Sequence, residues 1–164
     1  VKKSMLHFRG TAKVYQSDSE AHQAIISEKV QPGDVVVVRN VGPVGAPGMV
    51  EVMEATEAIV NLGLDESVSL ITDGRFSGFC HGPIIGHVSP EAAIGGAIAL
   101  IKDGDMIEID IPNRSLKLDV SEEELEKRRK NLVLPEPKRK KGFMRTYAKN
   151  CLPPEKGAAM QSWD

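Results

Sequence analysis

The sequence predicts an α/β domain rich in β-structure, in which helices flank a barrel-like mixed sheet. Three observations carry this prediction. Four consecutive valines at 35–38 are typical of a strand that is buried on both faces. Alternating apolar and polar residues at 106–111 and 115–120 predict a hairpin, and segments with helix-capping residues lie between the strands. The spacing of these segments is too irregular for a dinucleotide-binding βαβ unit.

The individual elements follow from local signals. Gly10 interrupts the first strand, and Ser17 caps the first helix with Glu20 three positions later. Ser121 and Glu124 repeat that capping pattern before a charged helix. In chain order, the predicted strands are 6–15, 35–38, 68–72, 84–88, 98–101, 106–111 and 115–120, and the predicted helices begin at Ser17, near Met49, near Pro90 and at Ser121.

The composition changes at Leu134, where two prolines and the basic run 138–141 follow. We therefore predict a domain over residues 1–133 and a linker with a C-terminal arm over residues 134–164. The basic run is most simply a solvated tether.

Composition and charge narrow the function classes. The chain has 164 residues, the length of one ordinary domain, with 41% hydrophobic and 27% charged residues. A net charge of −2 favours neither nucleic acid nor an anionic membrane as the main partner, and no apolar run is long enough to cross a bilayer. Cys80 and Cys151 allow one disulfide at most and cannot supply the four thiolates of a typical iron–sulfur cluster. They favour a reducing compartment.

The first glycine-rich loop, residues 42–48, follows the valine strand and precedes a predicted helix. Its backbone N–H groups could form a cradle for an anion, or the glycines could simply allow a tight connection. Glu51 and Glu54 follow the loop. Their carboxylates could bind a hard cation such as Mg²⁺, or they could complement the helix dipole.

The second glycine-rich loop, residues 73–82, follows the strand at 68–72. It holds five chemically capable side chains, which are Asp73, Arg75, Ser77, Cys80 and His81. Arg75 could hold a substrate carboxylate by a two-pronged contact. Ser77 is not in a nucleophile elbow and needs a nearby cation or base to act as an alkoxide.

Structural roles compete with chemical ones in this second loop. Asp73 could cap a turn, and His81 could make a structural hydrogen bond. His81 and His87 are poorly spaced for a metal pair.

An ordered set of motifs resembles the C-terminal domain of the dihydroxy-acid dehydratase family, which also includes 6-phosphogluconate dehydratase and the sugar-acid dehydratases. The resemblance covers nearly the whole chain. The motifs are Asn40 to Glu51, Thr72 to Gly78, His81-Gly82, Gly86 to Ala92, Lys102 to Asp105 and Ile109 to Arg114.

This resemblance implies a fold similar to the swivelling domain of aconitase, closing over an active site built with a large N-terminal domain or subunit. In such enzymes that larger part carries the iron–sulfur cluster and most of the Mg²⁺ site. The family reaction removes water from a 2,3-dihydroxy acid, a branched-chain precursor or a sugar acid, to give a 2-oxo acid. The resemblance further implies a homodimer, in the cytoplasm or an organelle matrix.

The resemblance also assigns roles to single residues. Ser77 matches the serine whose alkoxide removes the C2 proton, and Glu51 matches a Mg²⁺ carboxylate. Arg75, Ser77 and Cys80 are then the substrate-binding residues. Because the cluster ligands are absent from this chain, we expect a fragment of a full enzyme or a small subunit, inactive in isolation.

Three positions depart from the family pattern. Many relatives have Glu where Val41 stands, Gly where Phe79 stands, and Ser or Thr where Cys80 stands. A thiol is a weaker hydrogen-bond partner than a hydroxyl, and the Phe79 ring could narrow the pocket. These departures motivate an alternative, a non-catalytic binding or regulatory domain that has kept the fold. Retention of Ser77 and Glu51 argues against it.

Overall fold

The computed structural model describes residues 1–78 and 80–161, and within them six strands form one mixed sheet. The strand order is β4-β3-β2-β1-β5-β6. Strands β1 to β4 are parallel to one another, whereas β5 is antiparallel to β1 and β6 is antiparallel to β5. The strands are β1 (His7–Tyr15), β2 (Asp34–Val38), β3 (Ser69–Thr72), β4 (Ile84–Ile85), β5 (Met106–Asp110) and β6 (Ser115–Leu118).

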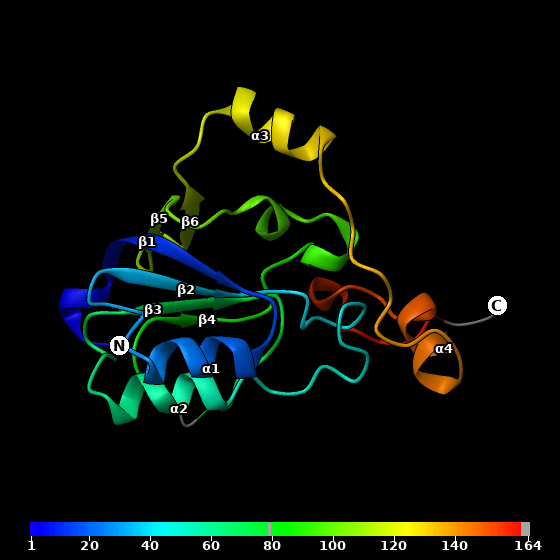
Figure 1. Ribbon diagram of the computed structural model, residues 1–164, viewed down its shortest axis with the longest axis horizontal. Coiled ribbons are helices and arrows are strands. Elements are labelled where there is room, and N and C mark those ends of the chain that lie inside the picture. Colours follow the sequence, from blue (N-terminus) through cyan, green and yellow to red (C-terminus); the bar gives the residue numbers. More distant parts are fainter. Residues whose placement is uncertain (79, 162–164) are drawn as a thin grey trace.

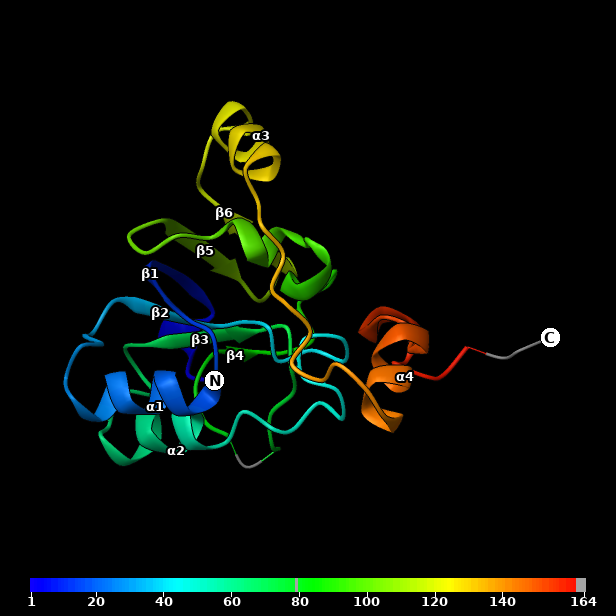
Figure 2. The same ribbon diagram turned by 45° about the vertical axis from the view of Figure 1, so that its right-hand side comes forward.

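The sheet curls into a half-barrel, with the β5–β6 hairpin turned away from the plane of β2 and β3 (Figures 1 and 2). Helices α1 (Asp18–Ile26) and α2 (Glu54–Asn61) cover one face side by side. Helix α3 (Glu122–Lys130) stands beyond the β5–β6 hairpin. Helix α4 (Phe143–Asn150) lies beyond the carboxyl ends of β2 and β3. The predicted β-rich α/β class and barrel-like mixed sheet are confirmed.

Two apolar layers form the core, one on each face of the sheet. Alternate valines of β2 serve different layers: Val36 and Val38 pack under the helices, and Val35 and Val37 face the inside of the curl. All four are fully buried, as the four-valine run predicts. The inner layer is completed by apolar residues of β5 and of the segment before it, namely Ile98, Ile101, Ile107 and Ile109.

The connections β1–α1–β2 and β2–α2–β3 are βαβ units with parallel strands. The sheet still differs from a dinucleotide-binding sheet, because its next long strand, β5, runs antiparallel against β1.

Gly10 does not interrupt the first strand. Strand β1 runs through it, and a Cβ there would stand 2.5 Å from the carbonyl oxygen of Gly33. The missing side chain lets the turn before β2 approach β1, where the Thr11 N–H donates to that same carbonyl. The glycine therefore serves close packing of backbone rather than a break in the strand.

Helix α2 begins at Glu54, five residues later than the expected start near Met49. The cause is a distant cap: the Asp18 carboxylate accepts the N–H groups of Met53, Glu54 and Ala55 at 2.9–3.0 Å. A carboxylate at a helix N-terminus satisfies otherwise unpaired donors and complements the dipole. Glu51 therefore lies in extended chain before the helix.

Two other segments differ from expectation. Of the predicted strand 84–88, Ile84–Ile85 forms β4 and pairs in register with β3, and the strand does not continue to Val88. The predicted strand at 98–101 contains instead a short 3₁₀ helix, Ala97–Leu100, and the helix expected from Pro90 shrinks to the 3₁₀ turn Ala92–Ile94. The Arg39 guanidinium accounts for the missing strand at 98–101, because it donates to the carbonyl groups of Ile98, Ala99 and Ile101.

Both predicted capping serines are confirmed: Ser17 accepts the N–H of Glu20, and Ser121 accepts that of Glu124. Helix α3 has no buried residue and is tied down by an ion pair between Arg128 and Asp105, both nearly buried. Among the residues described, no helix combines the length and apolarity that crossing a membrane requires.

Candidate functional site

Both glycine-rich loops leave the same edge of the sheet. Strands β2 and β3 are parallel neighbours, and their last residues, Val38 and Thr72, are partners in register. Residues 39–53 and 73–82 therefore start side by side at the carboxyl ends of the strands. In open parallel sheets this is the edge where ligands bind. In the structure the first loop comprises the whole connection 39–53, which contains the glycine-rich residues 42–48, and the second loop comprises residues 73–82.

Glu51 and Arg75 join the two loops. They form an isolated parallel β-bridge, in which the Val52 N–H donates to the Arg75 carbonyl at 2.7 Å. The Arg75 side chain adds a second link, because its Nε donates to the carbonyl of Met49 at 2.6 Å. The Glu51 side chain is exposed, so the bridge fixes its backbone while leaving its carboxylate open to solvent.

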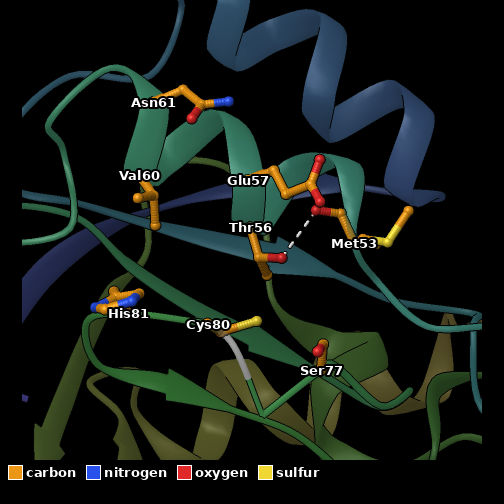
Figure 3. A pocket seen from close by; sticks show the side chains of 8 residues that line it. All are labelled: Met53, Thr56, Glu57, Val60, Asn61, Ser77, Cys80 and His81. Atoms are coloured by element: carbon orange, nitrogen blue, oxygen red, sulfur yellow. Dashed lines mark hydrogen bonds between the residues drawn. The ribbon is translucent and has the colours of Figure 1, made fainter.

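A pocket of about 350 Å³ lies between the second loop and α2 (Figure 3). Ser77, Cys80 and His81 line it from the loop, and the Cys80 N–H donates to the Ser77 carbonyl at 3.2 Å. The facing wall consists of residues at the start and along one side of α2, which are Met53, Thr56, Glu57, Val60 and Asn61.

Thr56 is the polar residue of α2 nearest the middle of that wall in Figure 3. Its hydroxyl donates to the carbonyl of Met53 at 2.8 Å. The pocket thus presents a serine hydroxyl, a thiol and an imidazole opposite a mixed apolar and polar helix surface, which suits a small polar ligand.

Asp73 is a completely buried carboxylate at the base of the second loop. It accepts the N–H groups of Asn40 and Val41 at 3.0 Å and that of Ala92 at 2.8 Å. Burial raises the pKa of Asp73, although these backbone hydrogen bonds oppose the rise. The structure gives contacts for a capping role of Asp73 rather than a chemical one. These contacts link the second loop to the first loop and to the segment that begins at Ala92.

Glu91 is a second completely buried carboxylate, and it occupies the first glycine-rich loop. Its two oxygens accept the N–H groups of Val44 and Gly45, each at 2.9 Å. Burial raises its pKa, and the negative charge of Asp73 adds to the rise. The anion cradle considered for this loop therefore exists, and the protein's own carboxylate fills it.

The C-terminal arm reaches the same loop. The Lys138 Nζ donates to the Asn40 carbonyl at 2.9 Å, and the Met144 methyl lies close beside Gly48. Glu155 is hydrogen-bonded to Ser89, shortly before Glu91. Figures 1 and 2 both show α4 beside the 40–48 segment. Nothing in the sequence pattern of residues 134–164 indicated these contacts.

The predicted site residues come together only in part. Ser77, Cys80 and His81 share the pocket, and Arg75 lies with Glu51 at the bridge. Glu54 is at the N-terminus of α2, as its helix-dipole interpretation requires. Among the described residues, no group of three or more His, Cys, Asp or Glu could hold a metal ion. Cys80 and Cys151 are both free thiols, so the single disulfide does not form.

The departures from the family pattern have different settings. Val41 is buried in the layer under the helices, where a methyl packs against Gly74, and it does not line the pocket that contains Ser77. Cys80 lines the pocket directly. Phe79 lies outside the described residues.

Comparison with known proteins identifies related chains over nearly the whole length. A family described as "Dihydroxy-acid/6-phosphogluconate dehydratase C-terminal" matches residues 1–158. The chain is 56% identical to a dihydroxy-acid dehydratase of Archaeoglobus fulgidus over 160 residues and 50% identical to one of Thermodesulfovibrio yellowstonii over 161 residues. In both comparisons the match covers 98% of this chain but 29% of the relative.

Proposed function

The chain belongs to the dihydroxy-acid/6-phosphogluconate dehydratase C-terminal family, and we propose that it is the C-terminal domain of a hydro-lyase. The substrate is a 2,3-dihydroxy acid, a branched-chain precursor or a sugar acid, and the product is the 2-oxo acid. The relatives named dihydroxy-acid dehydratase support this reaction class.

One observation carries the proposal from family to site. The two residues expected to act in the reaction, Glu51 and Ser77, stand on two loops that a parallel bridge holds together at one edge of the sheet. Ser77 lines a pocket of about 350 Å³, large enough for a small acid.

Ser77 is the residue that we propose to remove the C2 proton. As its alkoxide takes that proton, the C2–H electron pair forms a C2=C3 double bond and the C3–O bond breaks. The hydroxide that leaves takes up a proton and departs as water. The resulting enol gains a proton at C3 and loses one from its C2 hydroxyl, which gives the 2-oxo acid.

The neighbours of Ser77 bind and orient the substrate. Arg75 offers a guanidinium beside the bridge for the substrate carboxylate, and Cys80 lines the pocket at the position of a contact to a substrate hydroxyl. Its thiol makes weaker hydrogen bonds than a hydroxyl does, so this contact adds little binding energy.

The described residues do not form a complete cofactor site. Glu51 fits as one ligand of a Mg²⁺ ion, but hard-cation sites need several oxygen ligands, and two cysteines do not suffice for a cluster. In the whole enzyme, Mg²⁺ and an iron–sulfur cluster would supply the positive charge that favours an alkoxide and a departing hydroxide.

The chain spans 29% of the length of these two relatives, so the proposal requires a larger N-terminal part as its partner. That part would supply the remaining ligands and face the exposed side of Glu51. The homodimer and the location in a cytoplasm or organelle matrix stay predictions from the sequence.

The alternative, a non-catalytic binding or regulatory domain, was motivated by departures from the family pattern, and two of these departures give it little support. The Val41 departure is accommodated in the core rather than at the pocket. The Cys80 departure changes the strength of one contact and leaves Ser77 in place.

Thiol labelling combined with turnover tests the proposal in the complete enzyme. Because Cys80 shares the pocket with Ser77, a saturating dihydroxy acid that turns over should slow alkylation of Cys80 at least tenfold. Cys151, outside the pocket, serves as the internal control and should react at an unchanged rate. Absence of turnover, or labelling of Cys80 that ignores the substrate, would contradict the proposal.

A further inference from the structure

The strongest unexplained feature is the Glu91 carboxylate, which is buried without exposure inside the turn formed by residues 42–46. Both of its oxygens are engaged, one by the Val44 N–H and one by the Gly45 N–H. A charged group is placed in a protein interior only where such hydrogen bonds compensate its lost hydration.

The turn is shaped around this carboxylate. A Cβ on Gly42 would stand 2.6 Å from Oε2 of Glu91, so any larger residue would displace the carboxylate. The Ala46 N–H donates to the Gly42 carbonyl at 2.8 Å and closes the turn. Glu91 takes the position that a bound anion occupies in other backbone cradles.

The turn is linked directly to the candidate site. The Met49 N–H donates to the Ala46 carbonyl at 2.8 Å, and the Met49 carbonyl accepts Nε of Arg75. Two residues later comes Glu51, paired with Arg75 in the bridge. A shift of the turn would therefore move the backbone of Glu51 and remove the anchor of the Arg75 side chain.

Glu91 is itself held from the other side. The N–H of the next residue, Ala92, donates to the Asp73 carboxylate, which also binds the start of the first loop at Asn40 and Val41. Two buried carboxylates thus fix the first loop at its beginning and in its middle.

We propose that Glu91 is a positioning residue for the dehydration, which acts through the 42–46 turn to set the places of Glu51 and Arg75 without touching the substrate. The inference rests on the proposed function, because it concerns residues assigned to that reaction. It adds a carboxylate that neither the loop motifs nor the pocket identifies.

The test compares Glu91→Gln with Glu108→Gln in the complete enzyme. Gln has the same shape as Glu but turns an NH₂ donor towards one of the two N–H groups. Glu108 is an exposed carboxylate on β5, so its replacement controls for the lost charge. The measurements are kcat, KM and amide hydrogen exchange.

We expect at least tenfold faster exchange at Val44 and Gly45 in Glu91→Gln, with exchange in β1 to β3 unchanged. We expect kcat to fall at least tenfold and KM to change less. Gly42→Ala, which pushes the carboxylate out of the turn, should give the same pattern, and Glu108→Gln should match the wild type.

Three results would overturn the inference: unchanged exchange in the turn, faster exchange throughout the sheet, or a loosened turn with unchanged kinetic constants. If the wild-type enzyme dehydrates no 2,3-dihydroxy acid, the proposed function fails. The exchange pattern of Glu91→Gln then tests the positioning role without activity. Faster exchange that spreads from the turn to residues 49–53 and to Arg75 supports that role, and faster exchange confined to Val44 and Gly45 overturns it.

Discussion

Glu51 pairs with Arg75 through a parallel β-bridge that ties the two glycine-rich loops together. The pairing keeps the Glu51 backbone fixed while the Glu51 carboxylate remains exposed. Arg75, its partner in the bridge, lies two residues before Ser77 in the second loop. An exposed carboxylate on a fixed backbone is what a ligand shared with another part of a protein requires, since it loses little freedom when the metal binds.

Glu51→Gln in the complete enzyme should raise the Mg²⁺ concentration needed for half-maximal activity at least tenfold. An amide lacks the negative charge that hard cations prefer. The matched control is Glu54→Gln, which alters the next carboxylate along the chain at the start of α2. Titration of activity with Mg²⁺ checks the prediction, and an equal effect of both variants would show that Glu51 is no ligand.

The isolated 164-residue chain should fold but neither turn over 2,3-dihydroxyisovalerate nor bind Mg²⁺ tightly. Its described residues provide no group of three ligands, and in the proposed mechanism the N-terminal part supplies the Lewis acid for the leaving hydroxyl. Calorimetry and a 2-oxo acid assay check this. Micromolar Mg²⁺ binding that disappears in Glu51→Gln would contradict the proposed division of the metal site.

Asp73→Asn should destabilise the chain, because an NH₂ group would face backbone donors. We expect a loss on the order of 1–3 kcal/mol at pH 7. Burial raises the pKa of Asp73, so the folded state holds this proton more tightly than the unfolded state. The stabilising contribution is then full below the unfolded pKa, about 4, and falls as pH rises through the folded pKa.

The gap in unfolding free energy between the wild type and Asp73→Asn should therefore widen on acidification from pH 7. Urea unfolding at pH 7 and pH 5 measures it. Asp119→Asn, which breaks an exposed pair with Arg9, should cost less than about 1 kcal/mol and serves as the control. A gap that narrows towards acid pH would contradict a raised pKa for Asp73.

Arg128→Met should have the opposite pH dependence. Burial tends to raise the pKa of Asp105, but hydrogen bonds and charge from Arg128 and Lys102 outweigh it and lower the pKa. Stability from this pair is present above the unfolded pKa, about 4, and is lost as pH falls. We expect a loss on the order of 1–3 kcal/mol at pH 7 that shrinks in acid, measured by urea unfolding. A loss independent of pH would mean that packing, not charge, is removed.

The sequence predicts most of the fold where local signals act alone. The valine run of β2 and the caps Ser17 and Ser121 need only neighbouring residues to be recognised. The start of α2 was missed because its cap, Asp18, lies 36 residues from Glu54. The segment 98–101 has apolar residues typical of a strand, but the distant Arg39 side chain donates to its carbonyl groups, which therefore do not accept hydrogen bonds from a neighbouring strand.

The site shows the same limit. The second loop gave Ser77, Cys80 and His81 as neighbours because they are close in sequence. Glu91 was not singled out within the motif Gly86 to Ala92, because its hydrogen-bond partners Val44 and Gly45 lie 46 residues or more away in sequence and nothing local marks a carboxylate that will be buried. The first loop gave one indirect indication, because its backbone N–H groups can bind an anion and a carboxylate of the chain can serve as that anion.

We propose Ser77 as the base that removes the C2 proton, and the kinetics of Ser77→Ala in the complete enzyme are the sharpest test of this role. We expect kcat to fall by about 10²–10⁴, roughly 3–5 kcal/mol of transition-state stabilisation, with KM much less changed. Cys80→Ser, in the same pocket, should keep activity. If Ser77→Ala retains more than about a tenth of wild-type kcat, the lost stabilisation is below about 1.4 kcal/mol and Ser77 is not the base.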